Sequence, residues 1–203
     1  MKRMLWIALL VFTLSTLALA GSSVDFTNDG GTLNGSSSGL SLSGSELIAA
    51  NGFGGHGLIT GDLGSVTFST GSLSSGNLQT GGVFNGGGSF VITGNGTNGI
   101  PNEVLFNGTF SGPVTWTVVT LADGTLNYTL TGPISGTWFN GAKAVGATVQ
   151  LTINTGTTPF NGSTMLSSGD INCKTVVPEP GTLGLLGTGL VGLAGALRLK
   201  AKS

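Results

Sequence analysis

Residues 114–131 read Val-Thr-Trp-Thr-Val-Val-Thr-Leu, then Ala-Asp-Gly, then Thr-Leu-Asn-Tyr-Thr-Leu-Thr. In both outer segments threonine or asparagine alternates with larger apolar residues, which is typical of strands with one buried face. The Asp-Gly dipeptide between them favours a tight turn. The stretch therefore predicts an antiparallel hairpin. Trp116 and Tyr128 are in phase with its aliphatic residues, so we expect both in the core.

Similar but shorter patterns extend outward from this hairpin. Short runs flank a predicted Asn107-Gly108 turn, and a further pair of strands is expected across Asn140-Gly141. The remaining expected strands cover residues 45–50, 65–70 and 89–93. Residues 28–45 and 71–88 are Gly/Ser-rich with little alternation, and we expect loops or irregular edge strands there.

The number and spacing of these strands predict the fold class. Short strands with turn signals about every 8–12 residues are typical of an all-β domain, and we expect an antiparallel β-sandwich of the jelly-roll type. Frequent glycine disfavours helices, because each interior glycine costs about 1 kcal/mol relative to alanine. A β-solenoid is the alternative, favoured by the Gly, Ser, Thr and Asn content, although no fixed repeat is present.

The N-terminus has the three parts of a secretory signal peptide. Met1-Lys2-Arg3 is basic, and residues 4–17 are largely apolar. Ala18 and Ala20 are the small residues that a signal peptidase requires, so cleavage is expected before Gly21. A retained N-terminal anchor is the alternative. The segment predicts that the rest of the chain is exported.

The C-terminus contains a second apolar segment. Pro178-Glu179-Pro180 precedes residues 181–197, which contain no charge, and Arg198, Lys200 and Lys202 follow as a basic stop. As a helix, the segment would span about 25 Å at about 1.5 Å per residue. Long cationic side chains can extend to the membrane interface, so this length suits a transmembrane helix. The basic end is expected in the cytoplasm.

Together, these C-terminal residues resemble the PEP-CTERM sorting signal, which is the substrate tag of the membrane transpeptidases called exosortases. The tail departs slightly from the usual pattern, because its cations alternate with apolar residues. The resemblance implies that an exosortase is the processing partner and that Pro178, Glu179 and Pro180 are the recognition elements. It also implies a link to exopolysaccharide or biofilm. An ordinary membrane anchor is the alternative.

These signals divide the chain into four parts. Residues 1–20 are the signal peptide, residues 21–170 the exported β-domain, residues 171–180 a linker with the Pro-Glu-Pro motif, and residues 181–203 the helix and basic tail. The single cysteine, Cys173, is expected on the linker.

The exported segment offers little material for catalysis or nucleic-acid binding. It has seven acidic residues but only Lys143 and Lys174 as bases, so no basic patch supports nucleic-acid binding. No cofactor is expected, and one His and one Cys exclude a zinc centre, although a structural calcium ion stays open. Two constellations would support a hydrolase, His56 with Asp62 or Glu46 with Glu103.

We therefore expect a non-enzymatic protein of the cell surface or extracellular matrix, held transiently in the membrane before an exosortase processes it. A carbohydrate-binding or adhesion module is one alternative, with Trp138 as the candidate sugar contact. A secreted glycan hydrolase is the other.

Overall fold

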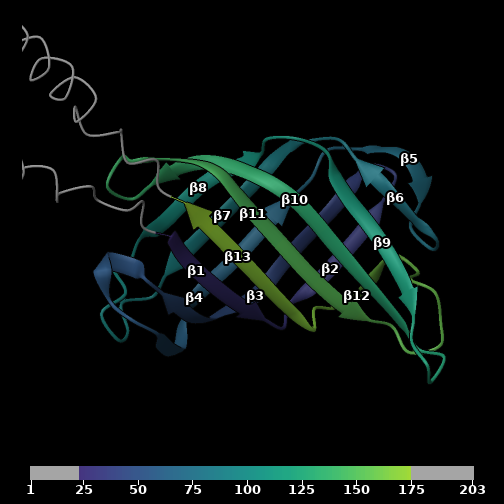
Figure 1. Ribbon diagram of the computed structural model, residues 1–203, viewed down its shortest axis with the longest axis horizontal. Helices are drawn as coiled ribbons and strands as arrows, with labels where there is room; N and C mark the ends of the chain where they lie inside the picture. Colours follow the sequence, from purple (N-terminus) through teal and green to yellow (C-terminus); the bar gives the residue numbers. More distant parts are fainter. Residues whose placement is uncertain (1–22, 175–203) are drawn as a thin grey trace, which may run out of the picture. The chain divides into compact units, whose positions relative to one another are not determined.

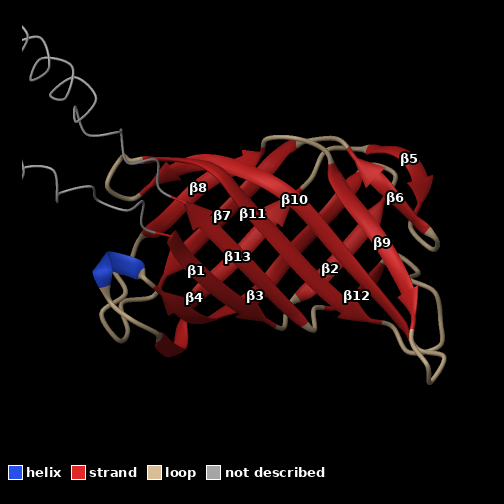
Figure 2. Ribbon diagram, viewed as in Figure 1, coloured by secondary structure: helices blue, strands red, loops and turns tan. Residues whose placement is uncertain are grey.

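The computed structural model describes residues 23–174, and these residues are almost entirely β-strands and turns (Figures 1 and 2). Within that range, no helix has the length and apolarity needed to cross a bilayer. The strands and the single 3-10 turn are β1 (Ser23–Asp29), β2 (Thr32–Ser36), β3 (Gly39–Asn51), η1 (Phe53–Gly55), β4 (Ile59–Ser69), β5 (Leu73–Asn77), β6 (Gly81–Phe84), β7 (Gly87–Gly94), β8 (Val104–Phe110), β9 (Val114–Thr120), β10 (Leu126–Trp138), β11 (Lys143–Asn154), β12 (Ser163–Met165) and β13 (Ser168–Lys174).

Eight of these strands form a closed ring. The ring order is β1, β3, β4, β7, β8, β10, β11 and β13, and β13 pairs with β1 to complete it. Figure 1 shows β1, β13, β11 and β10 side by side, as their registers require. All pairings are antiparallel and the ring follows chain order, so the fold is an up-and-down barrel.

The five other strands extend members of the ring. β3 pairs first with β2 and then with β1, so β1 and β2 form one long arm interrupted at Gly30-Gly31. In the same way, β10 pairs with β9 along its first half and with β8 along its second. β12 leads into β13, and β5 and β6 extend β4 and β7. The thirteen strands therefore act as eight long arms.

The expected all-β antiparallel class is confirmed, but the sandwich prediction is wrong. Alternation shows that one face of each strand is buried, and a sandwich and a closed barrel produce the same alternation. The difference lies in the β1–β13 pairing, which joins Phe26 to Ile171 across the length of the domain. No local pattern contains that pairing.

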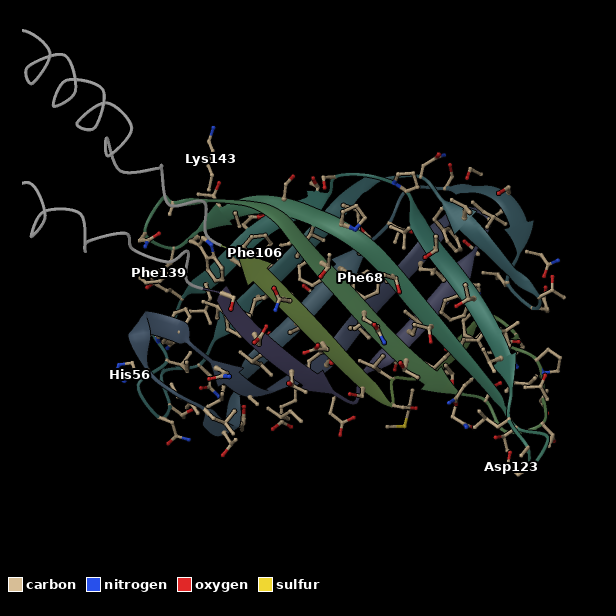
Figure 3. All side chains as sticks on the ribbon, viewed as in Figure 1. His56, Phe68, Phe106, Asp123, Phe139 and Lys143 are labelled. Carbon is tan, nitrogen blue, oxygen red and sulfur yellow. The ribbon has the colours of Figure 1, made fainter. Side chains whose placement is uncertain are left out.

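The interior of the barrel is filled by side chains rather than open. Phe26, Phe68, Phe90, Phe106 and Phe110 are all buried within it, and they pack at centroid separations of 5.5–6.2 Å with each other and with neighbouring aromatic rings. Offset and edge-to-face arrangements of this kind add to the free energy of burial. Figure 3 shows Phe68 and Phe106 within the ring of strands.

The hairpin predicted over residues 114–131 is confirmed as β9 and β10, with Thr120 opposite Leu126 and Thr115 opposite Thr131. The pairing across Asn140-Gly141 is also confirmed, as β10 and β11. The prediction of a turn at Asn107-Gly108 is wrong, because both residues lie inside β8.

Cys173 is not on a linker as expected. Residues 171–174 complete β13, and Cys173 is fully buried on the inner face opposite Val24. Residues 171–174 were expected in the linker, but they belong to the barrel wall because β13 closes the ring. The linker prediction missed them because a short stretch with one apolar alternation carries little signal.

Candidate binding site at one mouth of the barrel

Loops gather at the two ends of the barrel (Figure 2). At one end Ser23 pairs with Lys174, and residues 52–58, 95–103 and 139–142 connect the strands there. We call this end the terminal mouth and the opposite end the far mouth. Figure 3 shows His56 and Phe139 at the terminal mouth and Asp123 at the far mouth.

The far mouth is closed by loops that hydrogen-bond to buried aromatic residues. The indole Nε1 of Trp116 donates to the Leu78 carbonyl oxygen at 2.9 Å, and the Tyr128 hydroxyl donates to the Gln79 carbonyl oxygen at 2.8 Å. The same hydroxyl accepts the backbone N–H of Phe160 at 3.1 Å. Every polar group of this aromatic cluster is therefore paired, and the prediction of core positions for Trp116 and Tyr128 is confirmed.

The terminal mouth instead has a cavity of about 280 Å³, lined by Val24, residues 52–55 and residues 138–140. The turn on one side depends on Gly52, whose φ of 80° is in the left-handed region. A Cβ there would lie 2.5 Å from the Ser23 carbonyl oxygen. The turn closes with His56 N–H donating to the Phe53 carbonyl at 3.0 Å, which leaves the Phe53 ring buried beneath it.

The β10–β11 turn forms the other side of the cavity. Gly141 N–H donates to the Trp138 carbonyl at 2.8 Å, and Asn140 Oδ1 accepts the Ala142 N–H at 3.0 Å. Phe139 N–H donates to the Leu105 carbonyl of β8 at 2.9 Å. Trp138 is the last residue of β10, and Phe139 is the first residue of the turn. Trp138 is buried, whereas Phe139 is 47% exposed.

Trp138, the candidate sugar contact, lies in the wall of the cavity and is only 5% exposed. Its ring packs against Phe26 and Phe106, with centroid separations of 5.9 and 5.5 Å. Its buried Nε1 has no hydrogen-bond acceptor among residues 23–174, in contrast to the paired indole of Trp116. A buried N–H without an acceptor costs about 1–3 kcal/mol.

The candidate hydrolytic residues lie elsewhere. His56 is exposed in the loop beside the cavity, and Asp62 is exposed on β4, where its Oδ1 accepts the amide of Asn95 at 2.8 Å. Glu46 is exposed on β3 and Glu103 is exposed just before β8. None of the four lines the cavity. Across residues 23–174, no three His, Cys, Asp or Glu side chains are grouped as metal ligands would be.

The chain's clearest functional signal is outside the barrel. The family model of the PEP-CTERM protein-sorting motif matches residues 176–199. Residues 176–199 are a PEP-CTERM sorting motif. No curated protein and no solved structure matches the chain. The motif implies an exosortase-type processing partner and indicates export and sorting to the cell surface.

The PEP-CTERM match contains the three predicted recognition residues, Pro178, Glu179 and Pro180, together with Arg198. Lys200 and Lys202 follow it. All of these residues lie outside the described part of the structure, as do Ala18, Ala20 and Gly21 of the expected signal cleavage site. The sequence analysis did not single out Phe53 or Phe139. The only signal for Phe139 was its position directly after Trp138, beside the predicted Asn140-Gly141 turn.

Proposed function

We propose that this protein is a non-enzymatic component of the cell surface or extracellular matrix, delivered there by an exosortase-type enzyme that processes its PEP-CTERM motif. The observation that carries the proposal is the motif itself, at residues 176–199. Strand β13 ends at Lys174, so a single residue separates the barrel from the motif. The barrel is therefore the cargo that the sorting signal delivers.

The filled interior supports a structural or binding role. The inward side chains of the ring are apolar apart from a few buried polar groups, chiefly Asn28 and Ser45, which hydrogen-bond to each other at 2.7 Å. All acidic side chains from residue 23 to residue 174 are exposed or partly exposed. The known carboxylate pairs of hydrolases require two groups facing one substrate. Here the cavity has no such pair in its lining.

The outer face of the barrel suits a hydrated matrix. Along β9, for example, Thr115 and Thr117 are exposed between inward apolar residues. Their hydroxyls donate to carbonyl oxygens of the neighbouring strand, at 3.2 Å to Thr131 and 3.4 Å to Thr129. Such a surface presents hydroxyl and amide groups with few charges. We propose that it operates among extracellular polysaccharide, where uncharged polar contacts predominate.

The experiment follows the full-length protein in its native host. An epitope tag placed after Thr158, in an exposed loop at the far mouth, reports surface location without touching either terminus. The wild type, a deletion of residues 178–203 and a Glu179→Gln variant are compared by surface labelling and by mass spectrometry of the mature termini. Glu103→Gln is the matched control, because it neutralises an exposed carboxylate outside the motif.

We expect the wild type and Glu103→Gln to reach the surface with identical processed termini. The deletion and Glu179→Gln should accumulate unprocessed. The same termini and the same surface location in all four proteins would refute the sorting role of the motif.

A further inference from the structure

The terminal mouth is the part of the barrel nearest to the sorting motif along the chain. Strand β13 ends there at Lys174, opposite Ser23, and the match to the PEP-CTERM motif begins at residue 176. We propose that the connections at this mouth, residues 52–58 and 139–142, are a docking surface for the exosortase-type enzyme that processes the motif. The inference rests on the proposed sorting function and adds a second contact between the enzyme and its cargo.

The length of the connecting chain is the first observation. An extended chain spans at most about 3.6 Å per residue, so Pro178 lies within about 14 Å of Lys174. β10 runs between the two mouths over 13 residues. At about 3.4 Å per residue and a tilt of about 40°, the far mouth is about 30 Å away. Pro178, and the active site that receives it, are therefore closer to the terminal mouth.

The exposed apolar side chains of this mouth are the second observation. Leu58, Phe139 and Val104 are 68%, 47% and 45% exposed. The ring of Phe139 lies 5.6 Å from that of Phe53, which belongs to the same connection as Leu58. The backbone N–H of Phe139 donates to the carbonyl oxygen of Leu105, the residue after Val104. Phe139 thus contacts both neighbouring segments, and the apolar side chains gather at one end of the barrel.

The far mouth also exposes apolar side chains, so exposure alone does not identify the docking surface. Val119 and Leu121 are 60% and 39% exposed beside the turn that contains Asp123. The length of chain separates the two ends, because the terminal mouth is the one next to the motif. The far-mouth residues therefore provide controls of similar exposure.

The surface at the terminal mouth is held in place by its own backbone. The turn that contains Phe139 closes with Gly141 N–H donating to the Trp138 carbonyl oxygen at 2.8 Å. A preorganised surface loses little conformational freedom on binding. The exposed charges of Glu103 and Lys143 flank the apolar residues in sequence, and Figure 3 shows Lys143 near Phe139 at this end. An apolar centre with a polar rim is the usual composition of a protein interface, and rim charges contribute little to its affinity.

A small contact is sufficient here because the motif and the mouth belong to one chain. Once the enzyme holds the motif, the mouth is tethered beside it at a high effective concentration. The second contact then strengthens binding without a second loss of translational freedom.

The test is photocrosslinking of the full-length protein in its native host. Benzoylphenylalanine replaces Leu58 or Phe139 at the terminal mouth, and Val119 or Leu121 at the far mouth, one position at a time. Mass spectrometry identifies the adduct, which must be absent from a strain that lacks the exosortase-type enzyme. We expect positions 58 and 139 to form this adduct about fivefold more efficiently, or better, than positions 119 and 121.

Two further changes separate docking from recognition of the motif. Insertion of about eight Gly and Ser residues after Thr175 extends the reach by up to about 29 Å. It should reduce the adduct at positions 58 and 139 while the motif is still processed.

The variant Leu58→Ser with Phe139→Ser should slow processing about fivefold, because it removes the apolar centre of the surface. Val119→Ser with Leu121→Ser is the matched control and should leave the rate unchanged. Crosslinking tests the contact independently if the first of these variants folds poorly.

Three outcomes would overturn the inference. The first is equal adduct formation at all four positions, or none with the enzyme at positions 58 and 139. The second is adducts with lipid alone at those two positions, which would assign the mouth to the bilayer. The third is unchanged processing of a folded Leu58→Ser, Phe139→Ser variant. If Glu179→Gln still blocks processing in these cases, docking alone fails. If Glu179→Gln is processed normally, the proposed sorting function fails as well.

Discussion

At the residue scale, two tryptophans with similar sequence surroundings have different environments. Both Trp116 and Trp138 lie in β-strands and are almost fully buried. A loop at the far mouth supplies the Leu78 carbonyl oxygen as an acceptor for Trp116, whereas Trp138 borders a cavity at the terminal mouth. Alternation predicted core positions for Trp116 and Tyr128. It could not predict which indole would be hydrogen-bonded, because the acceptor of Trp116 comes from a loop 38 residues away.

Cys173 gives a prediction at the same scale. Burial raises the pKa of its thiol to about 12, and the nearby negative charge of Asp25 adds to the effect. Below a pH of about 9 the thiol is neutral in the folded and the unfolded chain. Between that pH and about 12, the unfolded chain loses a proton that the folded chain keeps. The free energy of unfolding should therefore fall by roughly 1 kcal/mol per pH unit.

Urea unfolding at a series of alkaline pH values measures this slope. Cys173→Ala is the control, because it removes the thiol while other groups still titrate, and its stability should decline less steeply. Identical slopes for the two proteins would show that the thiol is not protected. As a second readout, the native thiol should resist alkylation at mildly alkaline pH and react once the protein unfolds.

At the element scale, β8 contains an Asn-Gly dipeptide that lies within a strand and does not form a turn. Asn-Gly is the strongest signal for a tight hairpin turn, yet Asn107-Gly108 lies within a strand. Gly108 is opposite Gly136 of β10, and the Phe106 ring lies against both glycines. The glycines are required for close approach of a ring and a neighbouring strand. This requirement is set by the partner strand and is invisible in the local sequence.

Gly136 therefore makes a sharp test. A Cβ at this position would collide with the Asn107 carbonyl and approach the Phe106 ring to 2.7 Å. We expect Gly136→Ala to lower the free energy of unfolding by about 1–3 kcal/mol, as overpacking does in other cores. Urea denaturation followed by tryptophan fluorescence measures the change.

Gly57→Ala is the matched control, because a Cβ there meets no atom within 4 Å. It should change the stability by less than about 0.5 kcal/mol. A similar loss in both variants would mean that Gly136 is not held in close contact.

The same scale explains the Gly/Ser-rich segments. Residues 28–45 and 71–88 had weak patterns, and loops or irregular edge strands were expected. They contribute to β1, β2, β3, β5, β6 and β7. β5 is an irregular edge strand as expected, because it pairs with β6 alone and its register shifts between Leu73 and Ser75, whereas the other five strands each have a partner on both sides. Buried positions in them are few and widely spaced, such as Leu33, Leu40 and Phe84. β6 pairs with the strongly alternating β9, so its place in the sheet is set by its partner as well as by its own propensity.

At the scale of the whole molecule, closure of the ring depends on β13. Deletion of residues 171–174 would remove Ile171 and Cys173 from the core. It would also leave Phe26 and Val24 of β1 without their partners across the strand pair. Loss of one large buried side chain alone costs about 2–5 kcal/mol. We expect a chain ending at residue 170 to lose more than about 5 kcal/mol, which is close to the total stability of many domains.

The comparison is between chains of residues 21–176 and 21–170, both followed by circular dichroism during urea unfolding. The longer chain should unfold in one cooperative transition, whereas the shorter chain should lack a defined transition. If their midpoints agree, β13 is dispensable and the ring does not depend on it for closure.

The sequence by itself determined the strand-rich class, the central hairpin and the sorting motif, because each is encoded locally. Alternation specifies a buried face within a few residues, and the PEP-CTERM motif is a contiguous segment. Only the tertiary structure decided that the sheet closes on itself, that Cys173 is in its wall and that a cavity opens beside Trp138. These features depend on pairings between residues more than a hundred positions apart, such as Val24 with Cys173. Long-range pairings of that kind are selected by the packing of the whole interior.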